Sequence, residues 1–167
     1  MHVIACISAD GIVHWEHQFG SFKKPECQGF VRRVFDRLRL LHDLKDVVLV
    51  IDNAPCHSHV EDVTLEPMYT DATILRLGPY SPMLNPIENV FSAFKSQVKS
   101  FLARNRQEIV NTPAGTTQVA HRSAFLVRAA ELYFPAVATP QLCAACASHT
   151  LKFHGAVLTL ADVAVGE

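Results

Sequence analysis

The first part of the chain alternates hydrophobic and polar positions, and the period then becomes helical. Residues His2–Ser8 and 12–17 are rich in β-favouring side chains, and Asp10-Gly11 between them is a common sequence for a hairpin turn. From Glu26 onwards, apolar residues recur at helical spacing. This stripe comprises Phe30, Val31, Val34, Phe35, Leu38 and Leu41. The pattern therefore predicts a β-hairpin followed by an amphipathic helix.

The middle of the chain alternates between strands and short helical segments. Residues 47–51 form a continuous run of β-favouring apolar side chains, which is typical of a strand covered on both faces. A short helix over residues 60–69 and a second strand over residues 73–77 follow. The order hairpin, helix, strand, helix, strand, helix predicts an α/β fold with one mixed sheet and helices on both of its faces.

The clearest helix covers residues 85–101, with Asn85 as a suitable N-cap and Pro86 at the first helical position. Its core stripe consists of Val90, Phe91, Phe94, Val98, Phe101 and Leu102. Another face carries Glu88, Ser92, Lys95 and Lys99. We next expect a linker over residues 105–118 and a pair of helices over residues 121–135 and 141–153. The sequence of the tail from Gly155 indicates no particular role. We divide the chain into a domain over 1–104 and a linker with a helical extension over 105–167.

Composition narrows the class of protein. A chain of 167 residues with 49% apolar content can build one adequate core. The formal net charge of −1 argues against a free-standing nucleic-acid binder, whose domains are usually basic, but permits a site that holds phosphates through metal ions. The five scattered cysteines, with no recognisable signal peptide, predict free thiols in an intracellular protein. No apolar run reaches the length of a membrane span, so no membrane is expected among the partners.

Two short motifs carry the candidate chemistry. Asp52 ends an apolar strand in the sequence D-N-A-P-C-H, and ligands of α/β sheets bind at such strand ends. Glu88 lies in the first turn of a helix, after the sequence L-G-P-Y-S-P-M-L-N-P-I. Two carboxylates presented by rigid elements can hold divalent metal ions through oxygen. Each also has a simpler interpretation: Asp52 with Asn53 can form an Asx turn, and Glu88 can complete a capping box with Asn85.

Other polar residues have competing interpretations. Cys56, His57 and His59 are close in sequence, but a closed structural zinc site needs four ligands, so zinc is not expected. Lys95 and Lys99 either contact phosphate or form a solvated helix face. The remaining residues of this kind have structural interpretations, namely core packing for Cys143 and Cys146, and the hairpin turn for Asp10.

The two motifs resemble the catalytic core of the mariner-like cut-and-paste transposases, of the DDE superfamily endonuclease type. Asp52, Asn53 and His57 match the first block of that family, D-N-x-x-x-H. The second block, L-P-x-Y-S-P-x-L-N-P-I-E-x-x-W-x-x-x-K, is matched by Tyr80, Ser81, Pro82, Leu84, Asn85, Pro86, Ile87, Glu88 and Lys95. The chain departs from it at Gly78, where proline is usual, and at Phe91, where tryptophan is usual. The resemblance covers about residues 1–101.

The resemblance implies a ribonuclease-H-like fold, Mg²⁺ or Mn²⁺ as cofactor, DNA as partner and a homodimer as a candidate assembly. Asp52 and Glu88 would be the catalytic metal ligands. The residues implied in DNA contact are Asn53, His57, Lys95 and Lys99. Metal-bound water would hydrolyse a phosphodiester, and the freed 3′-hydroxyl would attack target DNA. In a eukaryotic host the protein would be nuclear.

The family pattern contains a third carboxylate that has no counterpart here. In the family it lies on the strand before the equivalent of His2–Ser8, so we expect an N-terminally truncated domain whose first strand is missing. Asp10 does not match that position. Two metal ions about 4 Å apart need shared carboxylates to offset their repulsion. We therefore expect this chain alone to be nearly inactive, and the alternative is a non-enzymatic remnant that binds nucleic acid or protein.

Overall fold

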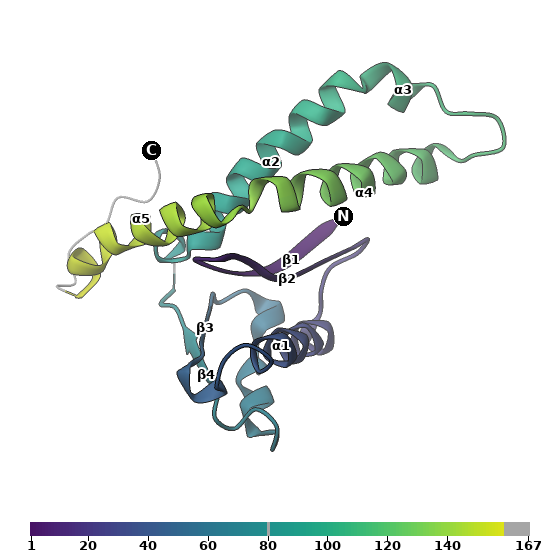
Figure 1. Ribbon diagram of the computed structural model, residues 1–167. Coiled ribbons are helices and arrows are strands. Elements are labelled where there is room, and N and C mark those ends of the chain that lie inside the picture. The colour runs from purple at the N-terminus through teal and green to yellow at the C-terminus, as the bar shows by residue number, and fades with distance from the viewer. Residues whose placement is uncertain (80, 159–167) are drawn as a thin grey trace.

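The computed structural model describes residues 1–79 and 81–158, so the motif residue Tyr80 and the tail from residue 159 lie outside the described residues. The chain begins with the predicted hairpin (Figure 1), formed by the antiparallel strands β1 (His2–Ser8) and β2 (Gly11–Gln18). Gly11 closes the turn with a φ of 111°, a conformation that side chains with a Cβ rarely adopt. The hairpin prediction is confirmed.

The hairpin is the central layer of the molecule, between two hydrophobic cores (Figure 1). Neighbouring side chains of a strand point to opposite faces. Ile4 and Cys6 pack on the first core, whereas Val3, Ala5 and Ile7 pack on the second. The strands that are covered on both faces are therefore those of the hairpin.

Helix α1 (Lys24–Leu38) covers one face of the hairpin and supplies five of the eleven buried residues of the first core. Phe30, Val31, Val34 and Phe35 are buried as the helical period predicts. The prediction is wrong for Leu41, because the helix ends at Leu38 and the Leu41 side chain is 77% exposed.

Strands β3 (Val48–Ile51) and β4 (Thr73–Arg76) form a separate, parallel two-stranded sheet. The expected single mixed sheet is therefore wrong, since the described residues form two small sheets. The expectation that the β3 strand is covered on both faces is also wrong. Leu49 and Ile51 face the first core, but Val48 is 56% and Val50 40% exposed.

Short 3₁₀ turns connect these elements. They are η1 (Leu44–Asp46), η2 (Pro55–His57), η3 (Val60–Leu65) and η4 (Pro82–Leu84). The predicted helix over residues 60–69 is thus a shorter 3₁₀ segment that ends at Leu65. Residues beyond it, including the buried Tyr69 and Ala72, still close the first core.

Four helices complete the fold: α2 (Pro86–Arg104), α3 (Arg106–Val110), α4 (Gln118–Val137) and α5 (Pro140–Leu158). The helical pair α4 and α5 is confirmed, whereas α3 lies within the expected linker. Phe134 is the centre of the second core. Its ring centroid lies 4.9 Å from the ring centroid of Trp15 and 5.3 Å from that of Phe94.

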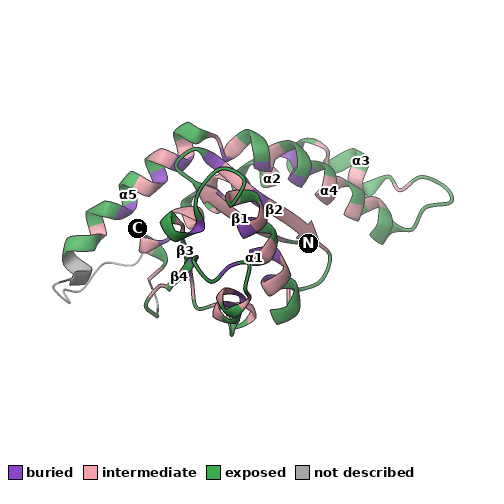
Figure 2. Ribbon diagram, turned by 60° about the horizontal axis from the view of Figure 1, so that its bottom comes forward, coloured by how far each residue is buried: buried purple, intermediate pink, exposed green. Residues whose placement is uncertain are grey.

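Burial follows this arrangement. Figure 2 shows exposed residues at the outer ends of α3 and α4 and buried residues where the helices approach the hairpin. Cys143 and Cys146 are buried in the second core, as the packing interpretation of this pair predicts. Among the helices of residues 1–79 and 81–158, none is long and apolar enough to span a membrane.

Candidate functional site

Asp52 follows β3 directly, and its two carboxylate oxygens have different surroundings. Oδ1 accepts the Ala54 backbone N–H at 2.9 Å, so the Asx turn is present. The same Oδ1 is 2.6 Å from Nδ1 of His57. The described residues form no hydrogen bond to Oδ2, and the side chain is 41% exposed. The turn therefore occupies one oxygen and leaves the other open to a cation.

His57, at the end of η2, orients this carboxylate. An ionised carboxylate only accepts hydrogen bonds, so Nδ1–H of His57 is the donor. In the neutral ring, Nε2 then carries the free lone pair. The structure thus brings together two residues of the D-N-x-x-x-H motif, and it gives the histidine a positioning role.

Asn53 joins the ends of the two parallel strands. Its side-chain Nδ2 donates to the backbone oxygen of Leu77 at 2.6 Å, next to the Leu77 N–H bond to the Ile51 oxygen at 2.8 Å. In Figure 1 the chain leaves β4 at this edge and runs to the start of α2. Asn53 therefore fixes the point from which the loop toward Glu88 departs, and its contact with DNA stays a prediction.

Arg76, the last residue of β4, is a site residue that the motifs did not reveal. Its guanidinium donates to the backbone oxygens of Asp52 at 3.2 Å and His57 at 2.8 Å. Its Nε also donates to Oε1 of Glu61 at 2.7 Å. Burial alone would raise the pKa of Glu61, but a backbone hydrogen bond and Arg76 outweigh it and lower that pKa. Arg76 thus holds both ends of the Asp52 loop, and its only sequence signal was a lone arginine at a strand end.

Glu88 lies in the first turn of α2, which begins at Pro86 as predicted. Asn85 is the N-cap residue, but its side chain makes no capping hydrogen bond, so the capping box of the simpler interpretation is not formed. Within the described residues, the Glu88 carboxylate has no hydrogen bond or ion pair. The positive end of the helix dipole stabilises its charge. Capping does not explain this glutamate.

Lys95 and Lys99 follow on α2, and both are exposed. Neither forms an ion pair with any residue that the structure describes. Exposure is required by the phosphate-binding and the solvated-face interpretations alike, so phosphate contact stays a prediction.

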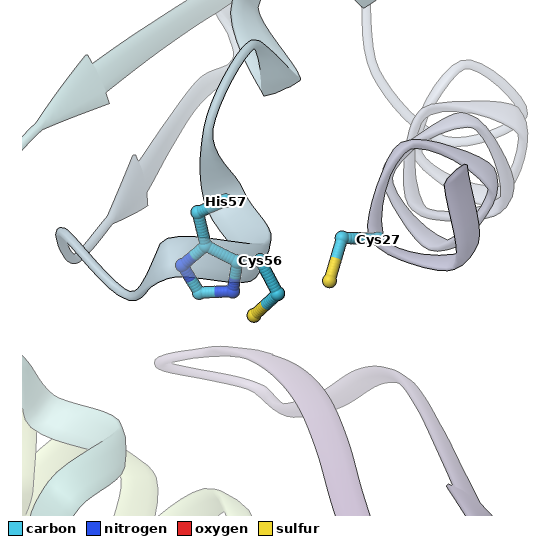
Figure 3. Close-up of side chains that lie close together, drawn as sticks. All are labelled: Cys27, Cys56 and His57. Atoms are coloured by element: carbon cyan, nitrogen blue, oxygen red, sulfur yellow. The ribbon is translucent and has the colours of Figure 1, made fainter. Parts of the chain in front are cut away.

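Beside Asp52 the structure also gathers Cys27, Cys56 and His57, whose ligand atoms all lie within 4.8 Å of one another (Figure 3). His59, the third member suggested by sequence proximity, is exposed and points to Asp62 instead. The third member of the cluster is Cys27, which belongs to α1. Burial, followed by the neighbouring Cys56 thiol, raises the pKa of Cys27 to about 12.

The fold and this site define an α/β protein with the Asp52 carboxylate at the end of a parallel strand pair and the Glu88 carboxylate in the first turn of α2. The chain matches the family described as DDE superfamily endonuclease over residues 2–133, and it belongs to that family. The match reaches into α4, further than the motifs suggested. Endonucleases of this family act on DNA and generally use divalent metal ions. Neither the curated proteins nor the solved structures contain a match to the chain.

Proposed function

We propose that the protein is a mariner-like transposase domain for metal-dependent DNA phosphodiester cleavage and strand transfer, with Asp52 and Glu88 as its metal ligands. The observation that carries this proposal is that both carboxylates have oxygen atoms to which no described residue donates a hydrogen bond. Oδ2 of Asp52 and the carboxylate of Glu88 are both without hydrogen bonds from described residues. They follow the ends of two parallel strands that Asn53 joins.

The donor set fits Mg²⁺ or Mn²⁺, because these hard cations prefer carboxylate oxygen. When bound, such an ion would polarise a phosphodiester and activate a water molecule. His57 and Arg76 would hold Asp52 in place through its Oδ1 and its backbone oxygen. Lys95 and Lys99 would contact the DNA backbone as point charges. Asn53 and His57 would lie near the same DNA strand.

The separation of the two sheets supports the proposal of a ribonuclease-H-like fold that lacks one strand. In the described residues each sheet has two strands, so every strand has one edge without a partner strand. A strand between the two sheets would supply the third carboxylate of the family pattern. We therefore propose that residues 1–167 alone bind one divalent ion and cleave DNA very slowly, because two carboxylates poorly offset the repulsion between two metals.

Metal binding tests this function directly. Mn²⁺ binding, followed by electron paramagnetic resonance, should weaken at least about 10-fold in Asp52→Asn and Glu88→Gln. Glu108→Gln is the matched control, since Glu108, like Glu88, is a glutamate in the first turn of a helix. Equal Mn²⁺ affinity in all four proteins, or no binding by the wild type, would refute the proposal.

One observation favours a second function, which is protein binding by a non-enzymatic remnant. The outer face of the β3–β4 pair exposes the apolar side chains Val48, Val50 and Leu75. A plasmid-nicking assay with Mn²⁺ separates the two functions. Nicking that Glu88→Gln abolishes would exclude the remnant, and nicking at a robust rate would also contradict the proposed low activity. Absent Mn²⁺ binding together with absent nicking would favour the remnant.

A further inference from the structure

The cluster of Cys27, Cys56 and His57 has the dimensions of a metal site. Tetrahedral zinc, with bonds of about 2.3 Å to sulfur and 2.0–2.1 Å to nitrogen, places its ligand atoms roughly 3.6–3.8 Å apart. The three ligand atoms here lie within 4.8 Å of one another, so shifts of about 1 Å would complete the geometry. Figure 3 shows both sulfurs and the His57 ring directed into one space between α1 and η2.

The histidine of this cluster is already arranged as a ligand. Nδ1–H of His57 donates to Asp52, which leaves Nε2 as the nitrogen for the cation. A metal-bound histidine almost always donates its other N–H to a carboxylate or carbonyl, which fixes the ring and strengthens the ligand. The bond between Asp52 and His57 supplies this second contact before any metal is present.

The chemistry of the three donors selects the cation. Thiolates and imidazole favour Zn²⁺, whereas Mg²⁺ and Mn²⁺ favour the carboxylates of Asp52 and Glu88. On binding, each thiol releases one proton to solvent, and a water molecule can occupy the fourth position of the zinc ion. Cys27 is 1% exposed whereas Cys56 and His57 are half-buried, so the ion would lie at the edge of the first core, where water can reach its fourth position.

The same two sulfurs could instead form a disulfide, but the structure favours the metal. A disulfide would involve only two of the three ligand atoms that lie within 4.8 Å of one another. A disulfide would also leave the preoriented Nε2 of His57 without a role. A bound metal ion therefore explains the positions of all three side chains, whereas a disulfide explains the positions of only two.

We propose that Cys27, Cys56 and His57 bind one Zn²⁺ ion, which ties α1 to the loop after β3 and holds Asp52 through His57. Nothing in the family match assigns this site, and the proposal does not depend on nuclease activity. Cys27 comes from the first helix and Cys56 and His57 from a distant turn. The ion would therefore join elements that local sequence leaves independent.

Cobalt(II) is the probe, because thiolate ligands give it an intense charge-transfer absorption. The reduced, metal-free protein should develop this band with one equivalent of Co²⁺ and lose it on addition of one equivalent of Zn²⁺. Cys27→Ala and Cys56→Ala should each weaken Co²⁺ binding at least about 10-fold. Cys143→Ala is the matched control, since Cys143 is a buried cysteine of the second core, and it should bind as the wild type does.

Several results would overturn the site. They are the absence of the band in the wild type, its full retention in Cys56→Ala, and a Cys27–Cys56 disulfide in place of cobalt uptake. Cys56 is only half-buried on a short turn, so its variant keeps the test valid even where Cys27→Ala fails to fold.

Two further variants separate this site from the carboxylate pair. Glu88→Gln should leave the cobalt band unchanged while it weakens Mn²⁺ binding. Asp52→Asn should reduce Co²⁺ affinity about 10- to 100-fold without removing the band, because it acts through His57. Loss of the band in Glu88→Gln would contradict a separate thiolate site, whatever the outcome for Mn²⁺.

Discussion

Replacement of Arg76 tests whether one guanidinium holds the loop that carries Asp52. Arg76→Ala removes hydrogen bonds to the backbone oxygens of Asp52 and His57, together with the ion pair to Glu61. The Arg76 side chain is 29% exposed, so water can only partly replace these donors. We expect both a loss of stability and a weaker metal site.

The size of the loss follows from the number of acceptors. A hydrogen bond from a charged donor contributes about 1.5–3 kcal/mol where it is buried, and partial exposure reduces this range. The ion pair with the half-exposed Glu61 adds little, as is usual for such pairs. A destabilisation of about 2 kcal/mol is therefore expected, which corresponds to a Tm lower by about 4–8 °C for a chain of this size.

Urea denaturation measures this difference, with Arg32→Ala as the matched control. Arg32 also pairs through two nitrogens with a glutamate, Glu66, but it contacts no backbone oxygen and is more exposed. Arg76→Ala should lower the urea midpoint more than twice as far as Arg32→Ala, with an unchanged m-value. Equal shifts would refute the reasoning, because they would show that the backbone oxygens of Asp52 and His57 do not depend on Arg76. Arg76→Ala should in addition weaken Mn²⁺ binding several-fold, whereas Arg32→Ala should not.

Two further predictions concern the second core and the pH dependence of stability. Phe134→Ala should destabilise the protein by about 3–5 kcal/mol, because the buried Phe134 ring packs against Trp15 and Phe94. Leu132 is 53% exposed, so Leu132→Ala should change the free energy of unfolding little. Urea midpoints that fall equally in the two variants would contradict this. Burial tends to raise the pKa of Glu16, but its hydrogen bonds with Arg33 and His14 outweigh burial and lower it. A lowered folded-state pKa stabilises the protein above the unfolded value of about 4.3 and ceases to do so as the pH falls through the folded value. Glu16→Gln should therefore reduce stability at about pH 6 and have little effect at about pH 3, and a larger effect in acid would reverse the assigned sign.

Local sequence determined the elements and the places where the candidate carboxylates stand. The hairpin with its Asp10-Gly11 turn, the helices α1 and α2 and the helical pair α4 and α5 all follow from period and turn chemistry. These signals act over a few residues, so they need no knowledge of the rest of the chain. Asp52 at a strand end and Glu88 in a first helical turn were predicted for the same reason.

The tertiary structure decided which surfaces meet. The apolar run at β3 predicted two covered faces, but β3 pairs only with β4 in the described residues, so Val48 and Val50 remain exposed. The hairpin, whose sequence is no more apolar, is covered on both faces because α1 packs on one side and α2 and α5 on the other. The hydrophobic period predicts that a face is apolar. The element that packs on this face is supplied by distant residues, so the period does not predict it.

The candidate site divides in the same way. The motifs predicted Asp52, Asn53 and His57, because they are neighbours in the chain. Arg76 and Cys27 could not be predicted, since each acts on the Asp52 loop from a separate element, β4 or α1. A lone arginine or cysteine carries no local period or spacing, so only the packing of β3 beside β4 and of α1 against η2 brings these two side chains to the site.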